Sequence, residues 1–428
     1  MNMPIDISAL KKAEPAARHD SLVHFPHPDG SRVPYKVFSS QEVYEREQAR
    51  IFRGPTWNFV ALECEIPNAG DYKSTFVGDT PVVVTRAPDG SLAAWVNRCA
   101  HRGALVCRKA KGNATSHTCV YHQWSYDTKG NLEGVPFRRG QNGAPGMPAD
   151  FKTAEHGMKQ LRVDSYKGLV FASFSEETPP LPDYLGAEMR PWIDRIMHKP
   201  VVYLGCTRQY AHSNWKLYYE NVKDPYHASL LHLFHTTFNI FRVGMKARSI
   251  PDSTHGLHSI ITATKIDDSD TASAYKQQAI RSMDDGFHLE DDSVLGFIQE
   301  YDEACTNHIQ SLFPQLVLQQ IHNTLVARQV LPKGPDQFEL VFHFFGYEDD
   351  TPEMRELRIK QANLVGPAGY ISMEDTEATE LVQRGTARDP HATSVIEMGK
   401  GNPTQQDSMI TESLIRRFWM GYQQIMGL

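Results

Sequence analysis

The segments Cys99-Ala100-His101-Arg102-Gly103 and Cys119-Val120-Tyr121-His122 decide the fold of the first half of the chain. Each segment offers one thiolate and one imidazole, and 17 residues separate His101 from Cys119. The short runs around them are rich in Val, Phe, Trp and Thr and alternate with turn signals, which is typical of strands. Two Cys/His loops on a β scaffold can close around one metal centre. We therefore predict a small β domain over 57–175 that holds a metal.

Three interpretations of the four Cys and His residues compete. A structural zinc site usually pairs like with like, Cys with Cys and His with His, whereas each loop here gives one of each. A Rieske [2Fe–2S] cluster has both cysteines on one iron and both histidines on the other, which fits the pattern. Four unconnected core residues rarely coincide at such spacings. The sequence favours Cys99, His101, Cys119 and His122 as ligands of a [2Fe–2S] cluster.

A second cluster contains Asn221, Asp224, His227 and His232. A mononuclear non-haem iron site needs two His and one carboxylate on one face, with its other positions open. On a straight helix, residues five apart point roughly 140° away from each other. His227 and His232 can therefore share a metal only if the helix breaks or bends between them. His235 follows three residues later and is a rival ligand.

The carboxylate ligand must come from a distant part of the chain. Four acidic residues lie between positions 374 and 380. If Ser372 were the N-cap of a helix, Asp375 would be an ordinary capping acid. Composition alone leaves the choice open between Asp375, Glu374 and Glu377.

Both clusters resemble the signatures of one family. The pattern Cys-x-His-Arg-Gly followed by Cys-x₂-His-x-Trp, and the pattern Glu-Asn-x₂-Asp-x-Tyr-His-x₄-His that begins at Glu220, are similar to motifs of the large subunits of Rieske aromatic-ring-hydroxylating oxygenases. Two residues near the first motif lie off it. We expect Cys107 to be a small buried residue and His117 to be a solvated loop histidine.

The resemblance implies a role for each residue of the second cluster. His227 and His232 are implied to bind a mononuclear Fe(II). Asp375, the second acid of the pair that follows a Gly-Pro-Ala-Gly segment, is the implied third ligand. Asp224 is the implied carboxylate that links an iron-bound His to a Rieske His of a neighbouring subunit. Asn221 is our second candidate for a catalytic residue and is expected in the pocket. A carboxylate that accepts N–H bonds from two imidazoles fixes their tautomers.

The chain is expected to be an α+β protein. Strand and helix patterns mix beyond a Pro-rich linker at 178–182, and the resemblance implies a helix-grip-like catalytic domain with an antiparallel sheet. The expected parts are an N-terminal segment that packs on the catalytic domain (1–56), the Rieske domain (57–175) and the catalytic domain (176–428).

Local signals predict several individual elements. A capping box formed by Ser39 and Glu42 predicts a helix that runs to Phe52. We expect a strand pair over 316–331 with a turn at His322-Asn323. Further predictions are strands over 168–174 and 337–347 and amphipathic helices over 354–364 and 410–426.

Arg328 lies in the apolar run 325–331 of a predicted strand. An Arg there can bind a carboxylate through a bidentate fork, or it can be an edge-strand surface residue. The whole chain resembles the branch of the family that acts on aromatic carboxylates, and three stretches are most similar to three-component anthranilate dioxygenases. The resemblance implies conversion of anthranilate to catechol, with 5-hydroxylation of salicylate or oxidation of another aromatic acid as the alternative. Phe238 is a second candidate for the pocket, although a Phe there is more often a core residue.

Composition and missing motifs narrow the partners. No Gly-rich dinucleotide fingerprint is present, so electrons for O₂ are expected from NAD(P)H through a separate ferredoxin, a reductase or both. The family implies a small β subunit and a core of three large subunits, α3 or α3β3. The net charge of −7 argues against nucleic acid. No long apolar run or signal peptide is seen, so no membrane contact and a cytoplasmic location are expected. The remaining rivals are an electron carrier and a zinc-containing binding protein without redox activity.

Overall fold

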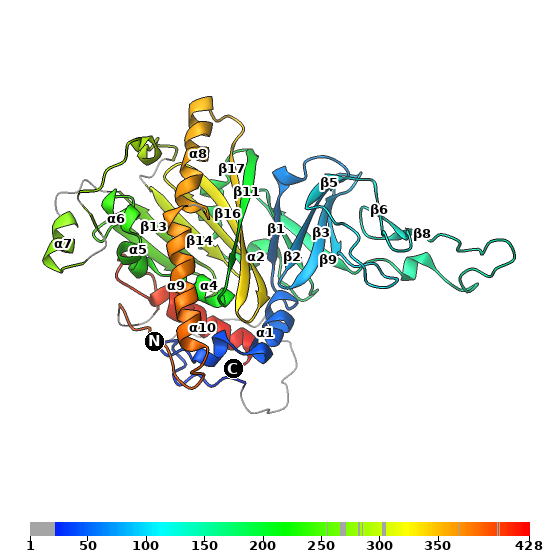
Figure 1. The fold of residues 1–428 in the computed structure, drawn as a ribbon, viewed down its shortest axis with the longest axis horizontal. Helices are drawn as coiled ribbons and strands as arrows, with labels where there is room; N and C mark the ends of the chain where they lie inside the picture. The colour runs from blue at the N-terminus through cyan, green and yellow to red at the C-terminus, as the bar shows by residue number, and fades with distance from the viewer. Residues whose placement is uncertain are drawn as a thin grey trace. The chain divides into compact units, whose positions relative to one another are not determined.

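The computed structural model describes residues 22–254, 256–265, 271–280, 283–284, 286–301, 305–367, 369–399, 401 and 403–428. The N-terminal part of the expected segment 1–56, up to residue 21, lies outside the described residues. The chain divides into two compact units. Phe52–Leu181 forms one, and the chain up to Ile51 joins Pro182–Leu428 in the other. Figure 1 shows strands in both units, and helices over the sheet of the larger unit. The chain is therefore α+β, as predicted.

The unit Phe52–Leu181 is built from antiparallel strands. One sheet has seven strands in the order β1-β10-β9-β4-β3-β2-β5, and a second has three in the order β6-β7-β8. The predicted strand over 168–174 is confirmed and is fully buried. The bounds are β1 Asn58–Leu62, β2 Asp71–Val77, β3 Thr80–Arg86, β4 Leu92–Val96, β5 Lys111–Asn113, β6 Ser116–Thr118, β7 Ser125–Asp127, β8 Leu132–Gly134, β9 Gln160–Tyr166 and β10 Leu169–Ser173.

The larger unit contains a second seven-stranded antiparallel sheet, in the order β11-β17-β16-β15-β14-β13-β12. The predicted strand pair and the strand after it are confirmed, and the first pair turns at His322, which has a φ of 50°. Every residue of β15 is buried, so the sheet forms the core of this unit. The bounds are β11 Val201–Ala211, β12 Lys246–Pro251, β13 Ser259–Thr264, β14 Asn307–Leu312, β15 Leu316–Ile321, β16 Thr324–Gly334 and β17 Gln337–Tyr347.

Helices cover this sheet. Figure 1 shows α8 and α9 in front of the strands, and α8 packs on β16 and β17. Helix α4 packs on both α9 and β16, which brings three distant segments together. The two predicted amphipathic helices correspond to α8 and α10. The bounds are α1 Gln41–Glu47, α2 Leu181–Leu185, α3 Arg190–Ile196, α4 Trp215–Asn221, α5 Pro225–Leu231, α6 Leu233–Thr237, α7 Thr271–Gln277, α8 Pro352–Val365, α9 Tyr370–Thr386 and α10 Ser413–Met426.

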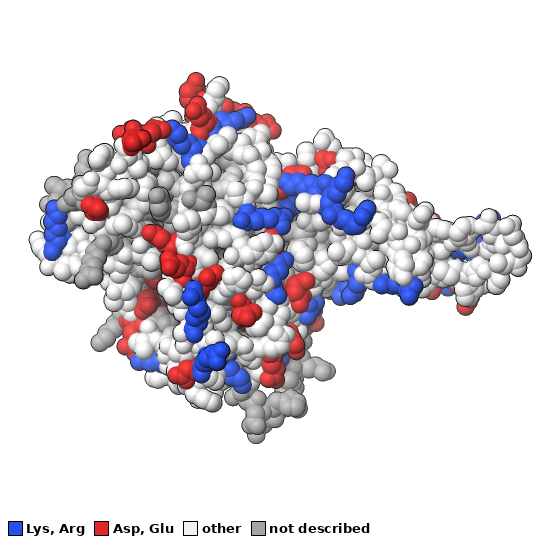
Figure 2. Space-filling model, viewed as in Figure 1, with Lys and Arg blue, Asp and Glu red and all other residues white. Residues whose placement is uncertain are grey.

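The surface of the larger unit carries both signs of charge. In the face drawn in Figure 2, positive and negative side chains are interspersed over this unit. Although the chain has a net charge of −7, that face carries no large region of a single sign. Among the described residues, no helix is both long and apolar enough to cross a membrane.

The start of α1 differs from the prediction by one residue. Ser39 ends a preceding 3₁₀ turn, so Ser40 is the N-cap, and its hydroxyl accepts a hydrogen bond from the Val43 N–H at 3.3 Å. The chain continues from α1 as a π-helical turn to Phe52. Local sequence signals located this helix but did not resolve which of two adjacent serines caps it.

A buried ion pair ties α1 to α4. The Lys216 Nζ lies 2.6 Å from Glu47 Oε1, and both side chains are fully buried. The Trp215 indole donates a hydrogen bond to the second Glu47 oxygen at 2.9 Å, and the Tyr422 hydroxyl donates to the first. One carboxylate thus connects α1, α4 and α10. A buried ion pair of this kind is costly to break, because the partner that remains keeps an uncompensated charge.

We expect Glu47→Gln to lower the free energy of unfolding of the larger unit by about 3–5 kcal/mol, because Lys216 would lose its counter-charge. Denaturant unfolding followed by tryptophan fluorescence measures the change. Visible absorbance of the predicted [2Fe–2S] cluster, recorded in parallel, reports on the other unit separately. Glu45→Gln, an exposed acid on the same helix, is the matched control. Equal midpoints for the two variants would contradict the expectation.

Candidate metal centres

Two loops of the unit Phe52–Leu181 bring the four predicted cluster ligands together. The first loop follows β4, and the second joins β6 to β7. The rings of His101 and His122 lie with centroids 4.5 Å apart. Cys99 and Cys119 are free thiols and are buried, whereas the His101 ring is exposed. Two thiols inside and two imidazoles toward the surface form a donor set that suits a [2Fe–2S] cluster.

Aromatic side chains of the same unit hold these loops in place. The Tyr126 hydroxyl lies 3.1 Å from Cys99 Sγ and accepts a hydrogen bond from the Ala100 N–H at 3.0 Å. The Trp124 ring stacks on the His101 ring, with centroids 4.8 Å apart and planes 7° apart. Tyr126 and Trp124 are both buried, so the loops rest on a fixed base.

Each loop closes through a residue in the left-handed backbone region. Gly103 has a φ of 79°, and its N–H donates to the Cys99 carbonyl. Gln123 has a φ of 57°, and its N–H donates to the Cys119 carbonyl. Glycine adopts this conformation without steric cost, which explains its place in the first motif. Gln123 takes the same kind of turn with a full side chain.

The prediction for His117 is wrong. His117 is only 4% exposed, and its Nδ1 lies 3.2 Å from Cys107 Sγ. Its ring makes edge contacts with Tyr72 and Trp95, each at 5.2 Å. Burial lowers the pKa of His117 and raises that of Cys107 to about 12, so the pair is neutral. The reason is strand alternation, because His117 is the inward residue of β6. Cys107 is the small buried residue that was predicted.

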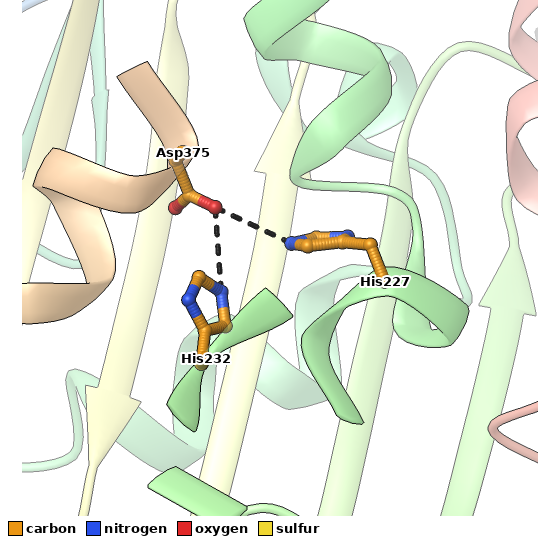
Figure 3. A group of neighbouring side chains, drawn as sticks. All are labelled: His227, His232 and Asp375. Carbon is orange, nitrogen blue, oxygen red and sulfur yellow. Dashed lines mark ion pairs between the residues drawn. The ribbon is translucent and has the colours of Figure 1, made fainter. Parts of the chain in front are cut away.

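His227, His232 and Asp375 meet in the larger unit. Figure 3 shows the two rings turned toward the same carboxylate oxygen. Asp375 Oδ1 lies 3.3 Å from His227 Nε2 and 3.3 Å from His232 Nε2. One donor atom from each residue lies within 4.8 Å of the others, close enough for all three to bind one ion. Two imidazoles and one carboxylate, with a cavity beside them, form a donor set that suits Fe(II).

A helix break allows the two histidines to face each other. Helix α5 ends at Leu231, and His232 has a non-helical backbone with φ −84° and ψ 83° before α6 begins. The predicted break is therefore present, and it lies at His232 itself. At the other end, Asp224 caps α5 by accepting from the N–H groups of Tyr226 and His227. The cap fixes the first turn that carries His227.

The far nitrogen of each ring faces a second carboxylate. Asp224 Oδ2 lies 3.4 Å from His227 Nδ1, and Glu374 Oε2 lies 2.8 Å from His232 Nδ1. Such outer carboxylates favour a proton on the far nitrogen and leave the Nε2 lone pair for a metal. Asp224 and Glu374 therefore orient the rings.

The position of Asp375 on α9 distinguishes it from its acidic neighbours. Asp375 is 3% exposed and belongs to the group of donor atoms, whereas Glu377 is exposed. The alternative with a Ser372 cap is wrong, because Gly369 is the N-cap of α9. Ser372 lies inside the first turn, where its hydroxyl donates to Gln209 Oε1 at 3.0 Å. Asp375 is therefore not a capping acid.

Electrostatics in this group favour a bound cation. Burial would raise the pKa of Asp375, but the charges of His232 and His227 and their hydrogen bonds lower it well below its usual range. Burial also opposes the charge on His227, yet Asp224 and Asp375 raise its pKa to about 10. The Asn221 amide donates to Asp375 Oδ1 at 3.0 Å. Carboxylates that hold protons on buried imidazoles will equally stabilise a divalent metal ion.

His235, the rival ligand, lies outside the donor group. Its ring centroid lies 5.7 Å from that of His232, and the side chain is 3% exposed. Burial, assisted by the neighbouring histidines, holds the pKa of His235 well below its usual value. His235 therefore faces the cavity as a neutral imidazole.

A cavity opens beside the three residues. His227, His232 and Asp375 form one wall. The opposite wall is the sheet, which contributes Ile261, Ile309, Ile321, Gln319 and Arg328. An aliphatic sheet wall with few polar groups suits an aromatic ring.

Of the two residues predicted to contact the substrate, only one lines the cavity in the described structure. Arg328 lies on β16, between β15 and β17, is 3% exposed and lines the cavity. The alternative of an edge-strand surface residue is therefore wrong. Phe238 ends α6 and packs against the rings of Phe234 and Phe287, with centroids 4.7 and 5.7 Å away. Phe238 is not among the described residues that line the cavity.

Sequence reasoning missed two polar residues of this region. Tyr218 accepts a hydrogen bond from the Arg328 guanidinium at 2.5 Å, and Gln319 lines the cavity from β15. A signal for Gln319 was present, because it stands in the apolar strand run 316–321. No local pattern pointed to Tyr218, whose contact with Arg328 depends on how α4 packs on β16.

Comparison with known proteins covers both units. Residues 56–152 match the model of the Rieske [2Fe–2S] domain, and residues 202–427 match that of the ring-hydroxylating alpha subunit catalytic domain. The anthranilate 1,2-dioxygenase large subunit of Burkholderia cepacia is 79% identical over 96% of this chain and 97% of its own length. The terephthalate 1,2-dioxygenase terminal oxygenase subunit alpha 2 of Comamonas sp. is 46% identical over 95% of this chain and 98% of its own. The crystal structure of naphthalene 1,2-dioxygenase from Rhodococcus sp. has a TM-score of 0.76 at 22% identity, over 92% of this chain and 94% of that one, and shows a shared fold.

We expect Asp375→Ala to lose about one iron per chain while about two acid-labile sulfides remain, because only the mononuclear site loses a ligand. Metal analysis of the purified protein, combined with a sulfide assay, measures both quantities. The loss follows from the position of Asp375 Oδ1 between the two imidazoles.

Two variants are controls for this experiment. Glu377→Ala removes an exposed acid from the same helix and should keep all the iron. Asp224→Asn should also keep it, because Asp224 contacts the far nitrogen of His227. If Asp375→Ala keeps its full iron content, Asp375 is not an iron ligand. If Asp224→Asn loses iron, Asp224 is essential for holding His227 in place as a ligand.

Proposed function

The chain belongs to the family of Rieske aromatic-ring-hydroxylating oxygenase alpha subunits, and we propose that its substrate is anthranilate, which it oxidises to catechol. As a member, the protein is an oxidoreductase with a [2Fe–2S] cluster and a mononuclear non-haem iron. We assign the cluster to Cys99, His101, Cys119 and His122. The 79% identity to an anthranilate 1,2-dioxygenase large subunit supports the choice of substrate.

The observation that carries the proposal is a buried cation in the cavity. Arg328 is 3% exposed, and its guanidinium donates to the Tyr218 hydroxyl. Its Nε has no hydrogen-bond partner, and no acid of the described chain forms an ion pair with it. A buried charge is costly unless it is paired. An aromatic carboxylate would supply two oxygens in the geometry that a guanidinium binds best.

The rest of the cavity suits a ring with one carboxylate. Ile261, Ile309 and Ile321 present an aliphatic surface from the sheet to the face of such a ring. Arg328 is the one Lys or Arg among the described residues that line the cavity. A dicarboxylate such as terephthalate would place its second charge without a cation. The cavity therefore favours a monocarboxylate.

The proposed reaction is balanced. Anthranilate, O₂, two electrons and three protons give catechol, carbon dioxide and ammonia. The two metal centres supply activation of O₂ and delivery of single electrons when bound. This chain's residues hold the carboxylate at Arg328, orient His227 and His232 through outer carboxylates, and keep the ring against an apolar wall that excludes water. Since no dinucleotide fingerprint is present, the electrons reach it from NAD(P)H through a ferredoxin or reductase.

We also propose a small β subunit and a core of three large subunits, α3 or α3β3. The names of relatives, which are large or alpha subunits, support a multicomponent enzyme. Around the exposed His101, the side chains of Leu105, Val120, Tyr121 and Phe137 are exposed large hydrophobics, which favours a protein contact at this end of the cluster. Sedimentation of the co-expressed subunits measures the stoichiometry, and a stable lone chain would contradict it.

With a matching reductase chain, the enzyme should consume O₂ with anthranilate and release one catechol and one ammonia per O₂. Oxygen uptake, product chromatography and an ammonia assay measure this stoichiometry. Salicylate, benzoate and terephthalate serve as comparison substrates. A higher kcat/KM for any of these three would overturn anthranilate as the substrate.

Arg328→Met should lower kcat/KM for anthranilate by about 10- to 100-fold, mainly through KM, because a charged hydrogen bond to the carboxylate is lost. Cluster absorbance and iron content should stay at the wild-type level. Arg328→Lys keeps the positive charge but loses the bidentate geometry of the guanidinium. Its kcat/KM should lie between the values of the wild type and of Arg328→Met. Unchanged KM in Arg328→Met would exclude Arg328 as the carboxylate anchor.

A further inference from the structure

Gln319 is a polar residue on the aliphatic wall of the cavity. It lies on β15, opposite Ile309 of β14 and Val326 of β16. Because alternate residues of a strand share a face, Arg328 lies on the same face as Val326 and is a diagonal neighbour of Gln319. Both side chains line the cavity. The sheet therefore presents two adjacent polar groups to the ring, and its other lining residues there are Ile261, Ile309 and Ile321.

The Gln319 amide lacks a protein partner for its oxygen. The residue is 2% exposed, and Oε1 accepts no hydrogen bond from the described residues. The next residue on the strand, Gln320, points to the opposite face, where both polar atoms of its amide have hydrogen-bond partners. Its Nε2 donates to the His322 carbonyl at 2.8 Å, and its Oε1 accepts from Arg195 at 2.7 Å. A buried acceptor without a partner is destabilising. We therefore expect a ligand to supply the hydrogen-bond donor for the Gln319 oxygen.

We propose that Gln319 accepts a hydrogen bond from the ortho amino group of the substrate while Arg328 holds the carboxylate. The inference rests on the proposed function and specifies how the same cavity recognises its substrate. In anthranilate the amino carbon, C2, is directly bonded to C1, the carboxylate-bearing carbon. Two adjacent substituents therefore match two adjacent polar side chains of the sheet.

The second contact determines which ring edge reacts. If Arg328 is the only contact and holds the carboxylate, the ring can rotate by half a turn about its C1–C4 axis. Either the C1–C2 edge or the C1–C6 edge can then face His227, His232 and Asp375. Oxygen added at C1 and C2 leads to catechol with loss of carbon dioxide and ammonia. Oxygen added at C1 and C6, with O₂, two electrons and two protons, gives a cis-diol that keeps both the carboxylate and the nitrogen. A donor held at Gln319 selects the first edge.

The same contact selects between substrates. Benzoate satisfies Arg328 but has no donor for Gln319, so its binding leaves the amide oxygen unpaired. A site built around such a group discriminates strongly against an analogue that lacks the partner. We therefore expect a preference for anthranilate over benzoate of about tenfold or more in kcat/KM, arising at Gln319.

The test uses the complete enzyme with its reductase chain and the variants Gln319→Leu and Gln319→Met. Both variants should lose most of the preference for anthranilate over benzoate and should release clearly less than one ammonia per O₂ consumed. The missing nitrogen should appear in a diol that retains it, detected by mass spectrometry. Gln319→Glu keeps an acceptor oxygen, so its ammonia release should stay near one per O₂ although KM rises through repulsion between carboxylates. Gln405→Leu makes the same chemical change at an exposed residue that does not line the cavity, and it should keep the wild-type ratio of ammonia to O₂.

Anaerobic titration with anthranilate and benzoate, without reductase, gives a readout that is independent of turnover. The ratio of the two Kd values should fall toward one in Gln319→Leu and stay at the wild-type value in Gln405→Leu. Cluster absorbance checks that each variant is folded. If wild-type enzyme does not convert anthranilate, the proposed function fails. If it does, and Gln319→Leu and Gln319→Met keep both the Kd ratio and full ammonia release, the role of Gln319 is wrong.

Discussion

The carboxylate of Asp375, placed between the Nε2 atoms of His227 and His232, is the constraint on which the catalytic unit depends. It brings α9 to the junction of α5 and α6, two segments far apart in the chain. Buried charge of this kind is tolerated only when it is paired or binds a metal. Asp224 and Glu374 lie 3.4 and 2.8 Å from the outer nitrogens, and the inner nitrogens of both rings point toward Asp375. The helix break at His232 is therefore part of the metal site.

The two centres use histidine in opposite environments. In the smaller unit the His101 ring is exposed above buried thiols, which suits a group that must pass electrons to another protein surface. In the larger unit His232 is 3% exposed, and the substrate cavity next to it is walled by isoleucines. Exclusion of water strengthens electrostatic interactions and limits side reactions of activated oxygen. Exposure at one centre and burial at the other thus follow from electron transfer between protein surfaces and from oxygen chemistry.

The sequence predicted the parts that depend on local spacing and failed where packing decides. The strand at 337–347 follows from a run rich in apolar and aromatic residues, and the cluster motifs follow from rare donor residues at fixed intervals. The choice of Asp375 over Glu374 required family resemblance, because both acids lie on one helix and only packing shows which one faces His227. His117 was misplaced because a three-residue strand is too short for its alternation to be recognised. Gln319 was missed because the polar pair Gln319-Gln320, although it interrupts an apolar strand run, matches no motif.

The placement of Arg328 and Gln319 on interior strands explains how one cavity can combine precise recognition with fixed chemistry. Strands β15 and β16 are paired on both sides, so their backbone groups are satisfied and their side chains have defined directions. The metal ligands come from α5, from α9 and from the junction between α5 and α6, and none of them lies on the sheet. A substitution on the sheet therefore changes which substituents are recognised without removing a ligand. Recognition and oxygen chemistry are carried by separate elements, and the ring held between them is the point at which the two meet.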